Sequence, residues 1–310
     1  MNLRIYFIGA VFIMMVAPWV KGQGCSDAGF CTINSIRDHS SPVPKDSILK
    51  NTIKAGLSYG IGDFDIKIVS PYLEYGNSSL NNLTLSGKIT YVMTDGELGK
   101  FNNPGDLFFS SSYLINASYN TSINFISGIK IPLNNASATN NSGSLPMNYQ
   151  SSLGTFDLIF GLNVLFKDLG VSFAMQQPII DINKNDFITP ADPGSVESKY
   201  QSTNNYIRKG DILNRISYTL DIFKHRFLIR PSILSIYHMA DDTYADIGNE
   251  NIYINGSQGL TLNGNIFLTY NISKTGSIEL ILGTPFVTRK SRPDGLTREF
   301  VAAFEYIISF

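Results

Sequence analysis

The sequence predicts an all-β protein: a transmembrane antiparallel β-barrel of about twelve strands, with a short N-terminal segment in the periplasm or in the lumen. Three observations predict it. The chain begins with an export signal, apolar and polar residues alternate with a period of two from residue 51 to the last residue, and short and long connections alternate between the alternating segments.

The composition limits the classes of protein to which the chain can belong. Among 310 residues, 24 Lys and Arg stand against 25 Asp and Glu, and charged residues make up 16%, below the roughly 25% of an ordinary soluble domain. A near-neutral chain without a basic stripe is a poor nucleic-acid binder, so no nucleic-acid partner is expected. An apolar content of 43% excludes an intrinsically disordered chain.

The first 22 residues predict a Sec-type signal peptide. Arg4 supplies the positive charge, the stretch from Ile5 to Val16 is apolar, and cleavage after Gly22 follows small or modest side chains. The alternatives are an uncleaved helical anchor and a lipidated Cys25, and both fit less well. The run is short for a membrane-spanning helix, and the residues before Cys25 lack the usual lipoprotein pattern.

Residues 23–50 form an N-terminal segment without strand alternation. Its Cys25 and Cys31 are the cysteines of the chain, and outside the cytoplasm a close pair of cysteines predicts a disulfide. The segment is interpreted either as a periplasmic tail or as a plug inside the barrel. Compact structure is favoured by the predicted disulfide and by three apolar residues, Phe30, Ile33 and Ile36.

Residues 51–310 predict the barrel itself. In the first segment Ile53, Leu57 and Ile61 alternate with polar or small residues, as expected for a strand with two different faces. Most segments exceed the five or six residues of a typical soluble strand and reach the length that crosses a bilayer. The twelve predicted strands are 51–61, 64–76, 82–94, 106–117, 121–132, 154–166, 169–179, 211–223, 225–238, 258–271, 276–287 and 297–310.

The connections between these segments are sorted by length. Those after even-numbered segments are short, and those after odd-numbered segments are long, except the first, near Gly62. Transmembrane barrels have short periplasmic turns and long outer loops, whereas a soluble β-sandwich has no reason for this order. The predicted long connections are 94–105, 133–153, 180–210, 239–258 and 288–296.

The last segment adds an independent signal. Its apolar face ends on a C-terminal aromatic residue, in the manner of the assembly signal of bacterial outer-membrane barrels. The barrel-assembly machinery is therefore an expected partner, together with outer-membrane lipid. The residues that form the signal are Phe304, Tyr306, Ile308 and Phe310.

A barrel in lipid turns its apolar faces outward and its polar faces toward the lumen. Charges of both signs predict a lumen crossed by ion pairs, and the plainer interpretation is that they only fill and stiffen the interior. The lumen-facing candidates are Lys54, Lys88, Lys130, Asp157, Arg215, Asp221, Arg230, Glu279 and Glu305. The same face is predicted to carry Lys67, Gln176, His238 and Glu299.

The sequence contains only weak candidates for catalytic and metal sites. His238 follows Ser235 and precedes two aspartates, which leaves a barrel hydrolase as an unfavoured alternative. Asp241, Asp242 and Asp246 could hold calcium, although a solvated acidic loop is the favoured interpretation. No catalytic residue and no cofactor is predicted.

Several short motifs resemble one family of outer-membrane barrels, those grouped under the meta-pathway of phenol degradation and described as transporters. The chain also resembles, more remotely, channels for fatty acids and aromatic hydrocarbons. The segment 23–31 is similar to the mature start of such proteins from Bacteroidetes-type bacteria. The other motifs are Gly128-Ile129-Lys130-Ile131-Pro132, Leu153-Gly154-Thr155-Phe156-Asp157-Leu158 with Gly161, Gly283-Thr284-Pro285 and Asp294-Gly295-Leu296-Thr297-Arg298.

These observations predict a porin-like channel in the outer membrane of a Gram-negative cell. It would pass small solutes, hydrophobic or aromatic ones among them, by passive movement. One rival is a surface protein without transport, whose long loops 133–153, 180–210 and 239–258 bind a partner. The other rival is the barrel hydrolase, acting on lipid.

Overall fold

The computed structural model describes residues 50–80, 82–118, 120–295 and 298–310. The predicted signal peptide (1–22), the Cys25–Cys31 disulfide and the N-terminal segment up to residue 49 lie outside the described residues, so they remain predictions. Everything below concerns the described part of the chain.

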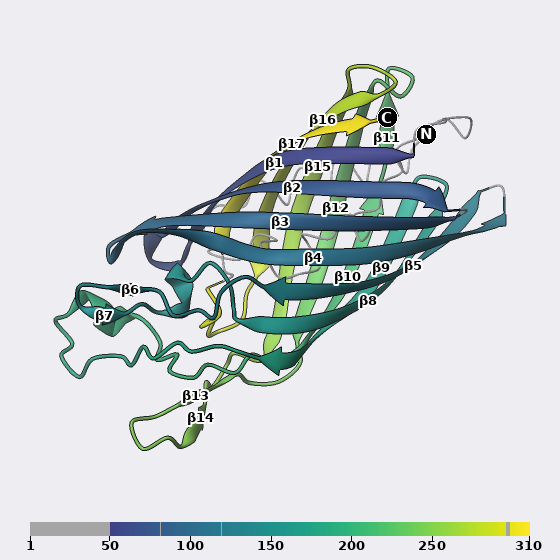
Figure 1. The fold of residues 1–310 in the computed structure, drawn as a ribbon. Helices are drawn as coiled ribbons and strands as arrows, with labels where there is room; N and C mark the ends of the chain where they lie inside the picture. Colours follow the sequence, from purple (N-terminus) through teal and green to yellow (C-terminus); the bar gives the residue numbers. More distant parts are fainter. Residues whose placement is uncertain (1–49, 81, 119, 296–297) are drawn as a thin grey trace.

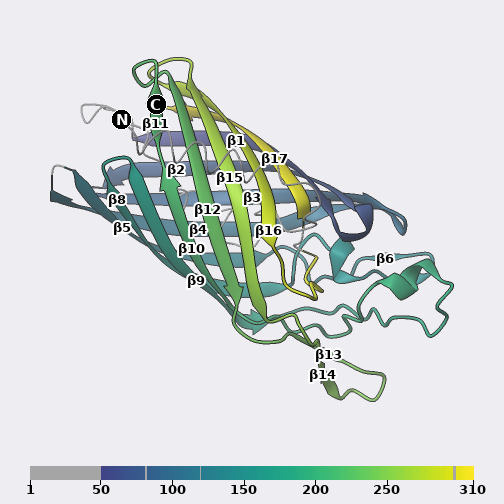
Figure 2. The same ribbon diagram turned by 180° about the vertical axis from the view of Figure 1, so that it is seen from behind.

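The chain forms a closed antiparallel barrel of 12 strands, as the sequence predicts (Figures 1 and 2). Each strand pairs with its neighbours in the chain, and β1 pairs with β17 to close the barrel. β10 and β11 pair with β12 in one continuous register, so they are two parts of a single strand interrupted at Thr219. The strands are β1 (Asn51–Gly62), β2 (Lys67–Leu80), β3 (Leu83–Gly96), β4 (Gly99–Ser118), β5 (Thr121–Pro132), β8 (Thr155–Phe166), β9 (Leu169–Asp181), β10 (Asp211–Tyr218), β11 (Leu220–Ile222), β12 (Phe227–His238), β15 (Gly259–Asn271), β16 (Gly276–Val287) and β17 (Arg298–Ser309).

The two ends of the barrel differ, as the connection lengths predict. Both ends of the described chain and the short hairpin turns lie at one end, here called the turn end, and the long connections gather at the other, the loop end (Figure 1). No helix in the described part of the chain is long and apolar enough to cross a membrane. The short elements of the loop end are η2 (Asp63–Asp65), β6 (Thr139–Asn140), β7 (Gly143–Ser144), η3 (Met147–Tyr149), η4 (Val196–Lys199), β13 (Thr243–Ala245) and β14 (Asn251–Tyr253).

One predicted long loop, 94–105, is instead part of a hairpin. β3 and β4 continue until Gly96 pairs with Gly99, which leaves only Glu97 and Leu98 as the turn. The Leu98 amide donates to the Tyr149 hydroxyl at 3.0 Å. The gap between the alternating segments 82–94 and 106–117 suggested a loop, but pairing with each other and packing against Tyr149 keep the two strands extended beyond the alternating region.

The outer surface of the barrel is apolar and carries aromatic residues at both ends. Large apolar side chains such as Leu57, Leu73 and Phe160 are exposed around the strands. This pattern fits a lipid-facing band flanked by aromatic girdles. Exposed aromatics near the loop end are Tyr59, Tyr91, Tyr237 and Phe300, and those near the turn end are Tyr75, Tyr113, Phe166, Tyr270 and Tyr306.

Lys67 lies on the outer face, not on the inner one as the alternation suggested. Its neighbour Ile68 and the next even-numbered residue, Ser70, are buried, while Lys67 is exposed at the start of β2. Pro71 obscures the alternation in this segment, and a shift of one residue moves every side chain to the other face. At the rim the ammonium group can stay solvated.

The barrel interior and its loop-side mouth as the candidate functional site

Eight of the nine predicted lumen-facing charges point into the barrel and are buried there. They come from strands all around the wall, and their burial follows from the alternation, which puts every second side chain inside a closed barrel. These eight are Lys54, Lys88, Lys130, Asp157, Arg215, Arg230, Glu279 and Glu305. Gln176 and His238 are buried as well.

The tightest interior ion pair joins β5 and β8. Lys130 Nζ lies 2.8 Å from Asp157 Oδ2 and donates to Thr155 Oγ1 at 2.9 Å. Gln176 on β9 donates to the same carboxylate. Because Lys130 and Asp157 face each other directly in the strand register, this contact fixes three adjacent strands from the inside.

A second group of charges lies on β12, β15 and β16. Arg230 approaches Glu279 at 3.4 Å, and the Thr269 hydroxyl donates to Glu279 at 2.7 Å. The guanidinium groups of Arg215 and Arg230 lie 5.6 and 5.1 Å from the ring centre of Phe267, within the range of a cation–π contact. An aromatic ring is thereby held between two cations inside the barrel.

A third group connects the two ends of the chain across the barrel seam. Lys54 on β1 lies 3.8 Å from Glu74 on β2, and Tyr72 donates a hydrogen bond to Glu305 on β17. Lys88 on β3 lies 3.7 Å above the Tyr72 ring. Charges of both signs are thus present on the inner wall.

Asp221 differs from the other eight predicted lumen residues. It lies on β11 at the turn end, where about a third of its side chain is exposed, and its partner is His225 in the adjoining turn. The alternation predicted the correct face of the strand, but it could not show how far Asp221 lies from the end of the barrel. Asp221 therefore belongs to the solvated rim and not to the buried interior.

The interior also has an apolar band on one side. Ile126, Ala174, Leu213 and Ile236 stand in one row across β5, β9, β10 and β12, with Gly161 of β8 in the same row. Buried apolar side chains flank this row above and below, and these are Phe108, Ile159 and Leu234. The barrel wall thus has an apolar band on the β4–β12 side, and a smaller apolar cluster of Phe267, Ile281 and Ala303 lies among polar and charged groups on β15–β17.

The mouth at the loop end is fastened by a buried cluster of charges, here called the mouth cluster. His238 at the end of β12 lies with Nδ1 2.7 Å from Asp211 and with Nε2 2.8 Å from Asp242. An imidazole ring donates through both nitrogens only when it is protonated, so the geometry fits a cationic His238. Tyr206 donates to the other oxygen of Asp242 at 2.7 Å.

The other half of the mouth cluster joins two arginines to Asp294. Arg289 lies 2.8 Å from Asp294 and donates to the Ser257 carbonyl at 2.8 Å. Arg208 binds Asp211 and approaches Asp294 at 3.5 Å. Connections 182–210, 239–258 and 288–295 therefore meet through one network whose three carboxylates balance two arginines and a protonated His238.

Burial and the neighbouring charges shift the pKa of Asp294 in opposite directions. Burial by itself would raise its pKa, but Arg289 and Arg208 hold the pKa below its usual value. Burial together with Asp242 raises the pKa of Tyr206 well above its ordinary range. The Asp294 carboxylate thus stays ionised and the Tyr206 phenol stays a donor at physiological pH.

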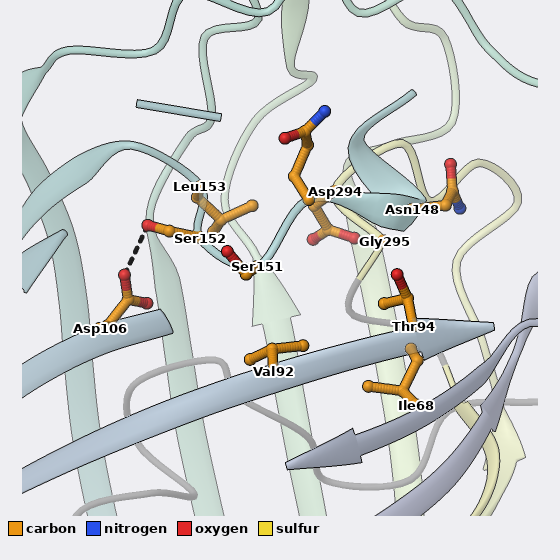
Figure 3. A pocket seen from close by; sticks show the side chains of 11 residues that line it. Ile68, Val92, Thr94, Asp106, Asn148, Ser151, Ser152, Leu153, Asp294 and Gly295 are labelled. Atoms are coloured by element: carbon orange, nitrogen blue, oxygen red, sulfur yellow. Dashed lines mark hydrogen bonds between the residues drawn. The ribbon is translucent and has the colours of Figure 1, made fainter. Parts of the chain in front are cut away.

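A narrow pocket adjoins the mouth cluster between the barrel wall and connections 133–154 and 288–295 (Figure 3). Its cavity volume is about 30 Å³, within about 420 Å³ of space that includes open solvent. Its floor is formed by Ile68 and Val92, and the Ser152 hydroxyl donates to Asp106 at one side. Asp294 and Asn148 lie at the other side, so the pocket reaches the mouth cluster directly.

The weakly supported hydrolase and calcium sites are not assembled in the described residues. Ser235 lies on the opposite face of β12 from the buried His238, whose two nitrogens are already bound. Asp241 accepts the backbone amides of Gly256 and Gln258, and Asp246 accepts those of Gly248 and Glu250. Within residues 50–310 as described, no three His, Cys, Asp or Glu residues gather where a metal could bind.

The mouth cluster was not expected from the sequence. Arg208, Arg289 and Asp294 lie in connections, where no periodicity shows which side chain is buried. The relevant signal was the low overall charge, which makes each charge in a connection a candidate for a specific partner. That signal does not say which charges pair.

The chain matches no protein-family model and no curated protein by sequence. Among solved structures, it is similar to an outer membrane channel from Pseudomonas putida F1, at 13% identity and a TM-score of 0.57, over 86% of this chain and 99% of that one. It matches the KdgM porin at 10% identity and a TM-score of 0.44, over 84% and 99% of the two chains. The NanC porin matches at 9% identity and 0.42, over 84% and 98%. At 13% identity the likeness to the Pseudomonas channel shows a shared fold: the closed antiparallel barrel of outer-membrane proteins.

Proposed function

We propose that the protein is an outer-membrane channel through which small solutes move passively. The observation that carries this proposal is the two-sided wall: apolar outside over the length of the strands, polar and charged inside. Such a wall is stable where lipid lies outside and a polar interior lies within. Solute would pass from the loop-end mouth along the interior charges toward the turn end.

The solute class we propose includes hydrophobic and aromatic molecules. The apolar row formed by Ile126, Ala174, Leu213 and Ile236 supports this, because an apolar face of a solute can lie against it. Membership in the transporter family of the phenol-degradation meta-pathway, with an origin in Bacteroidetes-type bacteria, is a proposal that rests on the short motifs of the sequence.

Conductance tests the channel directly. Purified protein in planar bilayers is expected to give discrete current steps, and liposomes that contain it are expected to swell in small permeant solutes. A variant without residues 23–49 is measured in parallel, because a plug would reduce both signals in the full chain. If neither protein conducts current or admits any solute, the channel proposal is wrong.

The alternative function is that of a surface protein which binds a partner without transport. The β13–β14 hairpin favours it, because the hairpin projects beyond the barrel and exposes Ile247 by 88% and Tyr253 by 66% (Figure 1). Shortening the hairpin between Ala245 and Asn251 separates the two functions. Conductance unchanged by the deletion supports the channel, and absence of conductance in every form supports the surface protein.

We also propose export by the Sec signal, formation of the Cys25–Cys31 disulfide in the periplasm, and insertion by the barrel-assembly machinery. Phe304, Tyr306, Ile308 and Phe310 lie on the outer face of the barrel end. The Phe310 carbonyl accepts the Asn51 amide at 2.9 Å where β17 meets β1. The proposed signal is supported by its position on the strand that pairs with β1 and closes the barrel.

Replacing Phe310 with alanine is expected to lower the amount of protein in the outer membrane several-fold. The backbone bond at the seam is retained, so the loss would come from recognition of the aromatic side chain. Heat-modifiable mobility of the outer-membrane fraction measures the result, and Phe223→Ala, an exposed aromatic in a turn, is the control. Equal levels of both variants would contradict the proposed signal.

A further inference from the structure

Three polar side chains stand side by side on the inner wall of β12 and β15. Ser232 faces Asn265 across the strand pair, and Asn263 lies two residues from Asn265 on the same face. Their residues are 5%, 3% and 0% exposed. Neighbours in such positions are about 5 Å apart, so the three side chains form one small polar surface, here called the amide patch.

The amide patch holds hydrogen-bonding atoms that the described chain does not satisfy. Ser232 Oγ, both amide atoms of Asn263 and Asn265 Nδ2 have no hydrogen-bond partner there. Buried polar groups in folded proteins are almost always paired, and a cluster of unpaired ones calls for an explanation. Interior groups elsewhere in this chain can be closely paired, as where Lys130 contacts both Asp157 and Thr155.

The surroundings of the patch identify the chemistry that would satisfy it. Arg230 Nε and Glu279 Oε1, also without partners in the described chain, lie nearer the turn end on the same wall. Donors and acceptors are therefore mixed within a short distance, and the Arg230–Glu279 pair leaves no net charge. Hydroxyl groups donate and accept at once, so an uncharged molecule with several hydroxyls fits this surface.

We propose that the amide patch is a recognition site for an uncharged, hydroxyl-rich small molecule such as a monosaccharide. Leu234, directly beside Asn263 in the strand register, joins the patch to the apolar band. A sugar ring has hydroxyl edges and C–H faces, so it can lie against both. The inference rests on the proposed channel and adds hydroxyl-rich molecules to the solutes proposed for it.

Gly283 on β16 lies close against the patch. It faces Asn265, and a methyl group at this position would stand 2.6 Å from Asn265 Oδ1. The amide of Asn265 would have to move to admit it. Gly283→Ala therefore perturbs the geometry of the patch without removing a hydrogen-bonding atom.

Binding is tested in detergent, independently of transport. Saturation-transfer NMR with D-glucose as the probe is applied to the full chain, to Asn263→Leu/Asn265→Leu and to Gly283→Ala. The double variant is expected to weaken binding about tenfold or more, because two amides that contact the hydroxyls are lost. Gly283→Ala is also expected to weaken D-glucose binding.

The matched control is Asn124→Leu. Asn124 is an amide on β5 that already accepts from Ser112 at 2.7 Å, away from the patch, and its replacement is expected to leave D-glucose binding unchanged. Heat-modifiable mobility shows that each variant is folded. If the double variant does not fold, the comparison of D-glucose binding between Gly283→Ala and the unmodified chain still tests the site.

The outcomes separate the site from the channel. No saturation transfer from the unmodified chain to D-glucose, or equal transfer from the patch variants and the control, overturns the site and means that the patch is satisfied by water alone. Conductance without D-glucose binding overturns the site and leaves the channel intact. Binding that depends on the patch in a protein without conductance supports the site and overturns the channel.

Discussion

Replacing Lys130 with methionine is expected to lower the free energy of unfolding by about 3–5 kcal/mol. Lys130 is 1% exposed and Asp157 0%, so loss of the ammonium leaves a buried carboxylate with no opposite charge beside it. Gln176 still donates to Asp157, but a neutral amide does not replace the charge. Urea titration of the protein in lipid vesicles, followed by the band shift on electrophoresis, measures the change.

The double variant Lys130→Met/Asp157→Leu tests the cause. With both charges removed, the penalty for an unpaired buried charge disappears, and the double variant should be more stable than Lys130→Met alone. Lys100→Met is the matched control, because Lys100 forms an exposed pair with Asp95 at 2.9 Å and such pairs contribute little. If both lysine variants behave alike, the interior pair has no special role.

Replacing Asp294 with alanine is expected to loosen the mouth and not the barrel. Arg208 and Arg289 lose a shared carboxylate in a buried site, which leaves the mouth cluster with one excess positive charge. Breaking a buried network in this way costs about 3–5 kcal/mol, here concentrated in the connections. Limited proteolysis within 182–210 and 239–258 should become at least tenfold faster, while the urea midpoint of the barrel changes little.

Arg292→Ala serves as the control for the mouth. Arg292 lies in the same connection but pairs with Asp63 at 2.6 Å, outside the mouth cluster. Its replacement is expected to leave cleavage of connections 182–210 and 239–258 unchanged. Equal cleavage of the two variants would show that the connections are held by something other than the charges around Asp294.

The pH dependence of the mouth follows from the lowered pKa of Asp294. A carboxyl whose pKa is lower in the folded protein than the ordinary 3.8 contributes stability above that value and loses it as the pH falls through the folded pKa. Proteolysis of the connections should therefore be constant between about pH 6 and pH 5, where His238 keeps its proton, and accelerate only below about pH 4. Acceleration already near pH 6 would contradict this assignment.

The wall of the barrel could be predicted residue by residue, because it depends on local alternation. The predicted strands correspond to those of the structure, and the predicted inner residues from Lys54 to Glu305 are buried, apart from Asp221 at the rim. Lys67 was assigned to the wrong face where Pro71 hides the alternation. The hairpin at Gly96 was missed because its extension depends on Tyr149, which is distant in the chain.

The candidate site was likewise predictable only where it depends on local alternation. The alternation identified Arg230 and Glu279 as interior residues, but it could not show that Asn263, Asn265 and Ser232 lack partners. That depends on the register between β12 and β15. The mouth cluster was also beyond prediction, because its arginines and aspartates come from three connections whose paths are set by packing at the mouth.

The sequence by itself determined the barrel, its strand count, its two faces and the sorting of its connections by length. These properties follow from a period of two and from the separation of apolar from polar side chains, and both are local. Only the tertiary structure decided which charges meet, which amides remain unsatisfied and how the connections are fastened over the mouth. Those contacts join strands and loops far apart in the chain, where ångström-scale geometry, and not composition, determines which atoms can bond.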